Sequence, residues 1–263
     1  MQHQPRKRFG QNFLRDPAVI ARIVAAVNPA ADDRVVEIGP GPGTLTEPLL
    51  ATLERLDVIE IDRDLVANLE AMSQYAGKLQ VHSADALRFD FAALAEERGG
   101  PLRLIGNLPY NISTPLLFHV LSQSEAIHDM HFMLQKEVVE RMAAGPGNRT
   151  YGRLSVMLAW RCSVSPLFGV GPGAFRPSPK VSSAVVRLIP HTTPPFEVGS
   201  PRLFGEVVTR AFSYRRKTLR NALKDMLSPG LLETLDIDPS ARPETLAPAD
   251  YGTISRALSQ PGQ

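Results

Sequence analysis

The chain has 263 residues, 43% of them hydrophobic and 21% charged, with one cysteine and a formal net charge of +2. This composition is ordinary for a soluble globular protein and excludes an internal disulfide, and the small net charge leaves any nucleic-acid binding to local basic patches. No run approaches the roughly 18 apolar residues of a membrane span, and the first residues lack the apolar segment of a signal peptide, so we expect a cytoplasmic protein without membrane contact.

Short apolar strands alternate with amphipathic helices from about residue 17 to residue 190. Asp16 and Pro17 predict the start of a first helix, because aspartate caps helix N-termini and proline fits the first turn. Seven strand-like runs follow, at residues 34–38, 57–61, 79–82, 102–105, 130–134, 163–170 and 184–189. Helical stretches between the first five predict a parallel α/β sheet covered by helices on both faces.

The strand pattern stops at about residue 196, and helical patterns take over. Two apolar stripes follow at helical spacing, one in residues 203–212 and one in residues 219–227. We therefore predict two domains, an α/β domain over residues 1–195 and a small all-helical domain over residues 196–263.

The six histidines show no spacing to cysteine or carboxylates that is typical of a metal site. His128 and His131 are the closest pair, but their three-residue spacing in a predicted strand puts them on opposite faces of the sheet. We therefore expect that the protein holds no metal ion.

Four polar residues follow the ends of the first four strands at nearly equal spacing. They are Glu37, Glu60, Asp85 and Asn107, which are separated by 23, 25 and 22 positions. Each gap is one strand-and-helix unit, so the four side chains gather along one edge of the sheet, where parallel α/β sheets bind ligands. One acid alone would most simply be a solvated loop charge, but four polar residues in register predict a site.

The loop after the first strand indicates what kind of ligand binds there. Gly39, Gly41 and Gly43 allow the backbone to approach a ligand closely, and Thr44–Glu47 matches a capping box that starts a helix. A dinucleotide fingerprint needs glycine or alanine at its sixth position, where this chain has threonine. The loop therefore favours a small ligand packed on backbone over a pyrophosphate.

The acids at the next two strand ends indicate what this ligand contains. Glu60 is placed to accept from both hydroxyls of a ribose, and Asp85 to accept from the amino group of an adenine. Together with the glycine loop, they predict a nucleoside ligand without phosphates.

Residues 107–110 read Asn-Leu-Pro-Tyr directly after the fourth strand. Asn107 offers an amide oxygen as an acceptor, and Pro109 favours an extended backbone at Leu108, which turns the Leu108 carbonyl outward as a second acceptor. Tyr110 offers a flat ring on which a base stacks. Two acceptors at one amino nitrogen favour the geometry of a nucleophile, so the pattern predicts chemistry on an exocyclic amino group. A strand-ending turn is the simpler alternative.

Together these motifs resemble the S-adenosylmethionine-dependent methyltransferases that act on the amino nitrogen of adenine. Residues 6–14, 175–185 and 211–221 are similar to three motifs of the ribosomal RNA adenine dimethyltransferases. The resemblance runs from about Arg6 to Leu223 and favours the branch that dimethylates two adjacent adenosines near the 3′ end of 16S ribosomal RNA. The chain departs from that pattern at Tyr214, where we expect glutamine in many relatives.

The resemblance implies a Rossmann-like, seven-stranded methyltransferase sheet followed by a small C-terminal helical domain, with S-adenosylmethionine as methyl donor. The residues expected to contact the cofactor are Asn12, Leu14, Gly39, Gly41, Glu60, Asp85 and Asn107. The residues expected to hold the target base are Asn107, Leu108, Tyr110 and Phe175. Phe175 completes an aromatic sandwich with Tyr110 in this interpretation, and a hydrophobic plug in a proline-rich hairpin is the alternative.

Residues 210–224 hold six basic residues and no acidic one. A solvated basic face is the usual role of such a run, but this one joins two predicted helices and concentrates charge, which indicates phosphate contact. The residues expected to bind RNA here are Arg215, Arg216, Lys217 and Arg220. Arg6, Lys7 and Arg8 form a second expected contact region, with a disordered basic tail as the alternative.

We therefore expect a monomeric enzyme that dimethylates 16S ribosomal RNA within the small ribosomal subunit and contributes to its biogenesis. Three alternatives remain open. One is the sister family that methylates large-subunit ribosomal RNA and confers macrolide resistance, and another is a ribosome-assembly factor for which methylation is secondary. The third, a nicotinamide-dependent oxidoreductase, is disfavoured by Thr44 and by the lack of a catalytic tyrosine-lysine or histidine-acid pair.

Overall fold

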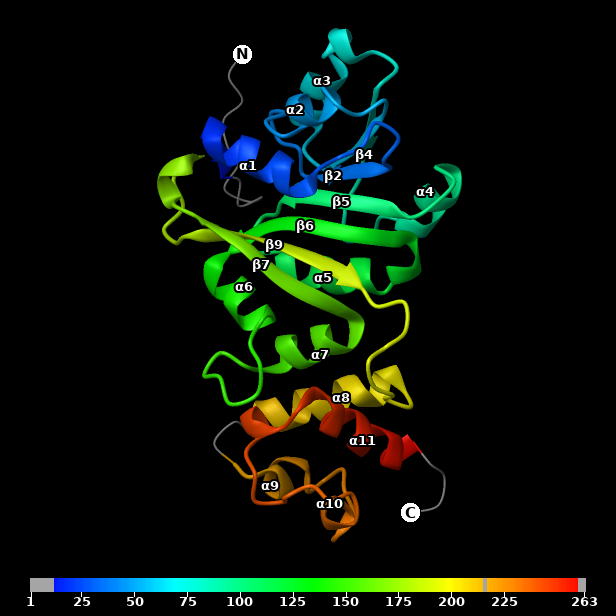
Figure 1. Cartoon of the computed structure of the whole chain (residues 1–263), viewed down its shortest axis with the longest axis vertical. Coiled ribbons are helices and arrows are strands. Elements are labelled where there is room, and N and C mark those ends of the chain that lie inside the picture. The colour runs from blue at the N-terminus through cyan, green and yellow to red at the C-terminus, as the bar shows by residue number, and fades with distance from the viewer. Residues whose placement is uncertain (1–11, 215–216, 260–263) are drawn as a thin grey trace. The chain divides into compact units, whose positions relative to one another are not determined.

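A computed structural model of the chain describes residues 12–214 and 217–259 (Figure 1). The chain divides into two compact units, one formed by residues 1–139 and 165–190 and the other by residues 140–164 and 191–263. The first unit contains the β-sheet. The second is helical, except for the first residues of strand β7 (Cys162–Val170).

The first unit is built on a seven-stranded sheet with the order β4-β3-β2-β5-β6-β9-β7. Besides β7, its strands are β2 (Val35–Ile38), β3 (Leu56–Glu60), β4 (Leu79–Ser83), β5 (Leu102–Asn107), β6 (Ile127–Gln135) and β9 (Ser183–Pro190). Strands β2 to β6 pair in parallel. All seven predicted strands are present, and the predicted Rossmann-like α/β fold is confirmed.

Strand β9 differs from the prediction of a parallel sheet, because it runs antiparallel to β6 with Ser183 opposite Gln135. A parallel neighbour needs a crossover connection, which is usually a helix. Residues 171–182, between β7 and β9, hold only the 3-10 turn η4 (Pro172–Ala174) and the two-residue strand β8 (Phe175–Arg176). The connection into β9 therefore lacks the helical crossover on which the prediction of a parallel strand rests.

Helix α1 (Pro17–Val27) precedes the sheet, and one helix follows each of its first five strands along the chain, as the alternating pattern predicts. These five are α2 (Thr46–Leu50), α3 (Arg63–Glu70), α4 (Phe91–Glu97), α5 (Ser113–Leu121) and α6 (Lys136–Met142), with 3-10 turns η2 (Ser73–Tyr75) and η3 (Ser124–Ala126). Asp16 caps α1 as predicted, since its carboxylate accepts from Ala18 N at 2.9 Å and Val19 N at 3.2 Å. The short strand β1 (Phe13–Leu14), which pairs antiparallel with β8, is not among the predicted strands.

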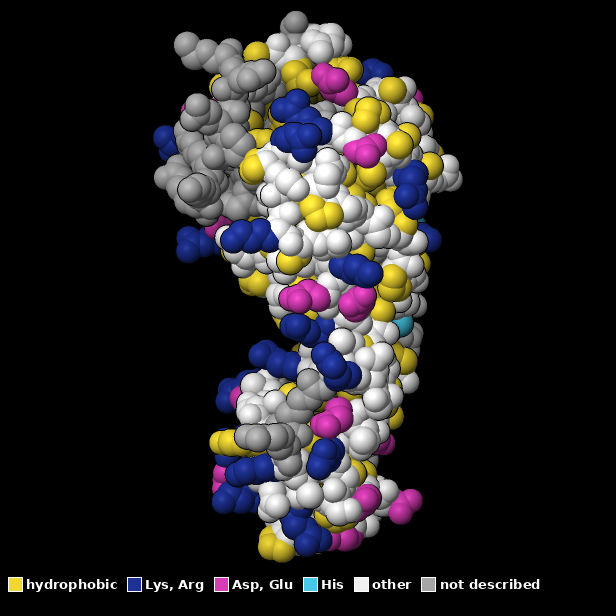
Figure 2. Space-filling view, turned by 90° about the vertical axis from the view of Figure 1, so that its left-hand side faces the viewer, with side chains coloured by type: hydrophobic (Ala, Val, Ile, Leu, Met, Phe, Trp, Pro, Cys, Tyr) yellow, Lys and Arg dark blue, Asp and Glu magenta, His cyan; other side chains and the backbone are white. Residues whose placement is uncertain are grey.

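The second unit contains α7 (Arg153–Arg161), α8 (Pro201–Ser213), α9 (Leu219–Leu223), α10 (Leu231–Thr234), η5 (Pro243–Thr245) and α11 (Pro248–Ser259). The predicted boundary between residues 195 and 196 assigns α7 to the first domain, whereas α7 shares the apolar core of the second unit. Trp160 on α7 packs edge-on against Phe204 on α8, with ring centres 5.5 Å apart. On the face of this unit that Figure 2 shows, Lys and Arg side chains (dark blue) lie among Asp and Glu side chains (magenta).

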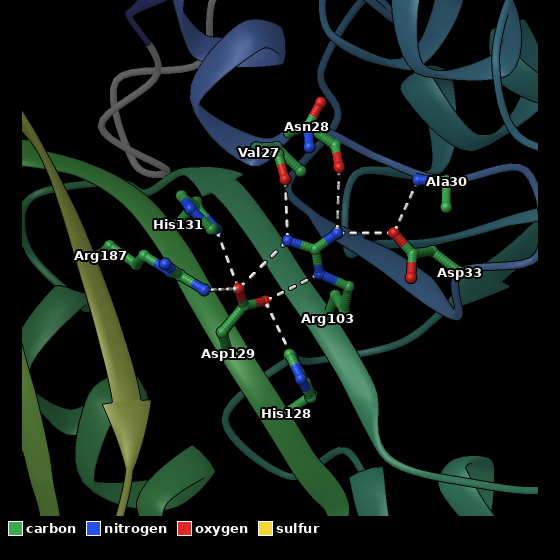
Figure 3. Close-up of polar contacts among 9 residues, drawn as sticks. All are labelled: Val27, Asn28, Ala30, Asp33, Arg103, His128, Asp129, His131 and Arg187. Carbon is green, nitrogen blue, oxygen red and sulfur yellow. Dashed lines mark hydrogen bonds and ion pairs between the residues drawn. The ribbon is translucent and has the colours of Figure 1, made fainter.

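An ion network centred on the buried Asp129 lies near the starts of β5 and β6 (Figure 3). Arg103 donates to both carboxylate oxygens of Asp129, at 3.0 and 3.1 Å, and to Asp33 at 2.5 Å. It also donates to the Val27 carbonyl at the end of α1, at 2.8 Å, while Arg187 on β9 donates to Asp129 at 3.0 Å. Burial acts to raise the pKa of Asp129, but the bonds and charge of Arg103 outweigh it, and the pKa lies below its ordinary value of 3.8. The network joins α1 to three strands of the sheet.

Candidate functional site

A cavity of about 250 Å³ lies at the carboxyl ends of β2, β3, β4 and β5, where the spacing of polar residues predicts a site. Its walls are residues 12–14, 37–42, 44–45, 59–61, 84–87 and 107–112. The predicted site residues that the structure brings together here are Asn12, Leu14, Gly39, Gly41, Glu60, Asp85, Asn107, Leu108 and Tyr110. They come from five separate segments of the chain, so the fold assembles the cavity that the sequence pattern indicates.

The glycine loop between β2 and α2 has a backbone conformation that glycine adopts readily and other residues rarely do. Gly39, Gly41 and Gly43 have positive φ angles of 67°, 58° and 88°. A Cβ atom on Gly41 would lie 3.0 Å from the ring of Phe13, which belongs to β1. The loop and β1 are therefore adjoining walls of the cavity, and a side chain at Gly41 would push them apart.

Glu60, the last residue of β3, directs its carboxylate toward backbone N–H groups. Oε1 accepts from Ile61 N and Asp62 N, both at 2.9 Å, and Oε2 accepts from Gly41 N at 3.3 Å. Burial raises the pKa of Glu60, and these three hydrogen bonds oppose part of the rise. Because Oε1 already has two donors, Oε2 is the oxygen with capacity for a ligand hydroxyl.

Glu37 is a second buried carboxyl in the cavity wall. The strand spacing places it among the four strand-end residues of the predicted site, but the sequence assigns it no ligand contact. It accepts a hydrogen bond from Thr46 Oγ1 at 2.6 Å. Burial raises the pKa of Glu37 to about 7, with the Thr46 bond opposing the rise and nearby Glu60 adding to it. The predicted capping box at Thr44–Glu47 is wrong, because the N-cap is Leu45, whose side chain makes no capping bond, and the Thr46 hydroxyl binds Glu37 instead.

Asp85 and Ile61 flank the cavity beyond the ends of β4 and β3. Asp85 Oδ1 accepts from Leu87 N at 2.9 Å, which holds the carboxylate in the cavity wall. Ile61 is 49% exposed although it is hydrophobic, and the residue pattern gave it no role. An apolar surface beside a carboxylate suits the flat face and the amino edge of a purine.

Asn107, the last residue of β5, has an amide that is oriented by the N-terminal segment. Its Nδ2 donates to the backbone carbonyl of Asn12 at 2.9 Å. This bond assigns the NH₂ side of the amide to the protein and leaves Oδ1 as the acceptor on the other side. Leu108 N donates to Met133 O at 3.2 Å and so attaches the next residue to the end of β6. The outward direction of the Leu108 carbonyl stays a prediction.

Tyr110 is partly buried in the cavity wall, and its hydroxyl makes a hydrogen bond of 2.7 Å with Ser183 Oγ. Ser183 is fully buried and is the first residue of β9. Burial raises the pKa of Tyr110, with the Ser183 bond opposing the rise, so the hydroxyl is neutral at physiological pH. The ring is therefore anchored at its far end by a residue that no local motif indicates.

Phe175 lies elsewhere than the resemblance implies. Its side chain is fully buried and forms no part of the cavity wall. It belongs to the apolar core that also contains Leu14, Met133 and Val185, because the pairing of Leu14 with Phe175 places both residues in the ribbon of β1 and β8. The expected aromatic sandwich with Tyr110 is wrong for this structure, and the alternative of a hydrophobic plug describes Phe175 correctly.

Five of the predicted RNA-contact residues lie outside the described part of the chain: Arg6, Lys7, Arg8, Arg215 and Arg216. Of the other two, Lys217 places its ammonium 4.8 Å from the centre of the Tyr214 ring. Arg220 donates to Glu233 at 2.6 Å. The fold thus places Glu233 of helix α10 next to Arg220. The basic run over residues 210–224 contains no acidic residue of its own.

Neither a metal-binding group nor a membrane-spanning helix is found among the described residues. No group of three or more His, Cys, Asp or Glu residues in residues 12–214 and 217–259 is arranged to hold a metal ion. Within the same ranges, no helix combines the length and the apolar character that crossing a membrane requires.

Two solved structures share this fold over nearly the whole chain. A dimethyladenosine transferase from Plasmodium falciparum matches with a TM-score of 0.77 and 27% identity, covering 92% of this chain and 95% of that one. The 23S rRNA methyltransferase ErmE matches with a TM-score of 0.71 and 25% identity, covering 95% of this chain and 100% of that one. The fold is that of RNA methyltransferases.

Comparison of sequences narrows this class. The model of the ribosomal RNA adenine dimethylase family matches residues 2–260. Proteins named ribosomal RNA small subunit methyltransferase A from Methylococcus capsulatus and Marinobacter nauticus are 57% and 55% identical to this chain. The matches cover 98% of this chain and 100% of the first relative, and 99% of this chain and 94% of the second. The chain belongs to the ribosomal RNA adenine dimethylase family, and the resemblance seen in its motifs is confirmed.

Proposed function

We propose that this chain dimethylates the exocyclic amino groups of two adjacent adenosines in the 3′-terminal hairpin of 16S ribosomal RNA, using S-adenosylmethionine. Its substrate is the small ribosomal subunit or an assembly intermediate, and the enzyme acts as a cytoplasmic monomer that contributes to subunit biogenesis. Membership of the dimethylase family and the names of its relatives support this substrate. The observation that carries the chemistry is the Asn107 amide, whose donor side is bound by Asn12 and whose acceptor side is left for a substrate amino group.

The charges of the cavity wall fit S-adenosylmethionine, a nucleoside with a net positive charge and no phosphate. The wall contains the carboxyl groups of Glu37, Glu60 and Asp85, and none of the described residues that line it is Lys, Arg or His. Acids favour a cation and disfavour a pyrophosphate. In this proposal Glu60 Oε2 accepts from a ribose hydroxyl, whereas the sequence led us to expect Glu60 to accept from both hydroxyls, and Asp85 accepts from the adenine amino group. The same wall argues against a nicotinamide dinucleotide.

The cofactor, when bound, supplies a methyl group that is already activated on a sulfonium, so the protein has to align the acceptor nitrogen with it. Asn107 Oδ1 accepts one hydrogen of the target amino group, and the Leu108 carbonyl accepts the other. The Tyr110 ring stacks on the base and fixes its plane. An asparagine amide cannot act as a base, so the proton released from the methylated nitrogen passes to water.

Replacing Glu60 should weaken cofactor binding. We predict that Glu60→Ala costs about 1–3 kcal/mol of binding free energy, because the ligand hydroxyl loses a charged acceptor and the N–H groups of Ile61 and Asp62 lose their partner. Calorimetric titration with S-adenosylmethionine measures this, with Glu54→Ala as a matched control at an exposed acid away from the cavity. Unchanged affinity in Glu60→Ala would remove Glu60 from the cofactor site.

Neutralising the basic run should weaken RNA binding. We predict that joint replacement of Arg215, Arg216 and Lys217 by Gln lowers affinity for the small subunit and flattens the slope of log affinity against log salt by up to about 0.9 per lost phosphate contact. Cofactor affinity should stay the same, because the cavity belongs to the first unit and these residues to the second. Filter binding at several salt concentrations measures the slope. An unaltered slope would move the RNA-binding surface elsewhere, most directly to residues 6–8.

The proposed function is tested in cells whose own 16S dimethyltransferase gene has been deleted. Supplying this chain should restore dimethyladenosine at both positions of the 3′-terminal hairpin, as read by mass spectrometry of ribonuclease fragments. The Asn107→Ala chain should not restore it. Methylation of large-subunit RNA in its place would favour the sister family. Restored subunit assembly without any methylation would make the chain an assembly factor first.

A further inference from the structure

The ring of Tyr110 is held by a residue 73 positions later in the chain, Ser183, through the hydroxyl bond of 2.7 Å. Ser183 sits at the start of β9, opposite Gln135 of β6, and has no exposed surface. The backbone of Ser183 is held in register with β6, so its side chain cannot shift far without moving the strand. Ser183 is therefore a rigid anchor beside the cavity.

The anchor acts on the segment that carries Asn107 and Leu108 into the cavity wall. Tyr110 lies in the connection between β5 and α5, whose N-cap residue, Ile112, makes no side-chain capping bond. Ser113 Oγ donates to the Tyr110 carbonyl at 3.2 Å, so the backbone at this point is tethered separately. The orientation of the ring depends on two side-chain torsions, and a hydrogen bond at the far end of the ring restrains both.

We propose that Ser183 is a positioning residue for methyl transfer, which fixes the plane of the Tyr110 ring against which the target adenine stacks. This inference rests on the proposed function. It predicts unequal effects on the two methyl transfers to one nitrogen. An unmodified amino group has two N–H hydrogens, one for Asn107 Oδ1 and one for the Leu108 carbonyl. A monomethylated nitrogen has only one, so it relies more on stacking for its alignment.

The test compares Ser183→Ala, Tyr110→Phe and the double variant with wild type, using small subunits that lack the modification. Each single variant should slow the second transfer about 5-fold, the effect of one hydrogen bond, and monomethyladenosine should accumulate. The KM for subunits should stay the same, because phosphate contacts dominate RNA binding. The double variant should be no slower than either single variant, since all three lack the same bond. Ser182→Ala, at the exposed neighbouring serine, is the matched control and should behave as wild type.

The possible failures can be told apart. If wild type methylates no adenosine, the proposed function fails and the inference with it. If wild type dimethylates and Ser183→Ala gives the same ratio of monomethyl to dimethyl product, only the inference fails. The inference would also be overturned if the losses of transfer rate in the two single variants added up in the double variant, or if the KM rose while kcat stayed the same. In either case Ser183 would act by a route other than the Tyr110 ring. Should Ser183→Ala not fold, Tyr110→Phe removes the same bond from the other side and carries the test.

Discussion

Asn107→Ala should leave the fold intact and reduce methyl transfer about 100–1,000-fold, the range that follows loss of one preorganised hydrogen-bonding group in an active site. The substrate amino group loses one of its two acceptors, while binding of the RNA through its phosphates persists. Single-turnover transfer to saturating small subunits measures the effect. Asn68→Ala, at an exposed position on α3 outside the cavity, is the matched control. A transfer rate near that of wild type in Asn107→Ala would show that the target base binds elsewhere.

Asn107→Asp tests the orientation of the amide separately from its ability to accept. A carboxylate is a stronger hydrogen-bond acceptor than an amide. If residue 107 acted only as an acceptor, Asn107→Asp would therefore keep full activity. In this site, however, the second carboxylate oxygen would face the Asn12 carbonyl, which is now 2.9 Å from Nδ2. Two acceptors repel, so the pKa of the aspartate should rise and activity should recover as the pH is lowered and the group becomes a donor. Activity equal to wild type at neutral pH would contradict the role of Asn12.

Asp129→Ala should give the largest loss of stability, because it leaves Arg103 largely buried without its bidentate partner. Removing one member of a buried ion pair costs roughly 3–5 kcal/mol. Urea denaturation at neutral pH measures the free energy of unfolding, and Asp32→Ala, at an exposed acid of the same segment as Asp33, is the control. A loss no larger than that of Asp32→Ala would mean that the network contributes nothing to stability.

The contribution of Asp129 should also depend on pH in a defined direction. Its folded-state pKa lies below the ordinary value of 3.8, so its ionised form stabilises the fold above that pH. As the pH falls through the lowered pKa, the carboxylate takes up a proton and this stability is lost. The difference between wild type and Asp129→Ala should therefore shrink in acid. A difference that stays constant from neutral pH to acid would contradict the ionised network.

The parts of the fold that the sequence predicts correctly are those encoded by local periodicity. Each of the five parallel strands is an apolar run with a helical pattern after it, and that repeat alone aligns Glu60, Asp85 and Asn107 at one edge of the sheet. The position of the site at this edge could therefore be predicted from the sequence alone. The antiparallel β9 could not, because its direction depends on the connection from β7 and not on the residues within the strand.

The error at Phe175 and the unexpected acid beside Arg220 have one physical cause, which is contact between segments distant in the sequence. The pairing of Phe175 with Leu14 places the Phe175 side chain in the apolar core. The ion pair with Glu233 sets the local charge around Arg220. The bond between Tyr110 and Ser183 likewise has no local indication. A motif shows which residue types are present, whereas such long-range contacts decide where each side chain points.

We expect this cavity to transfer methyl groups to the amino nitrogen of adenosine in the small ribosomal subunit. Transfer of tritiated methyl groups from S-adenosylmethionine to subunits that lack the modification, followed by nucleoside analysis, tests this activity directly. The label should appear as dimethyladenosine, with two methyl groups on each of two adenosines per subunit, and should be lost in Asn107→Ala. Label on another nucleoside, or none on the small subunit under conditions where the chain binds the cofactor, would contradict the claim.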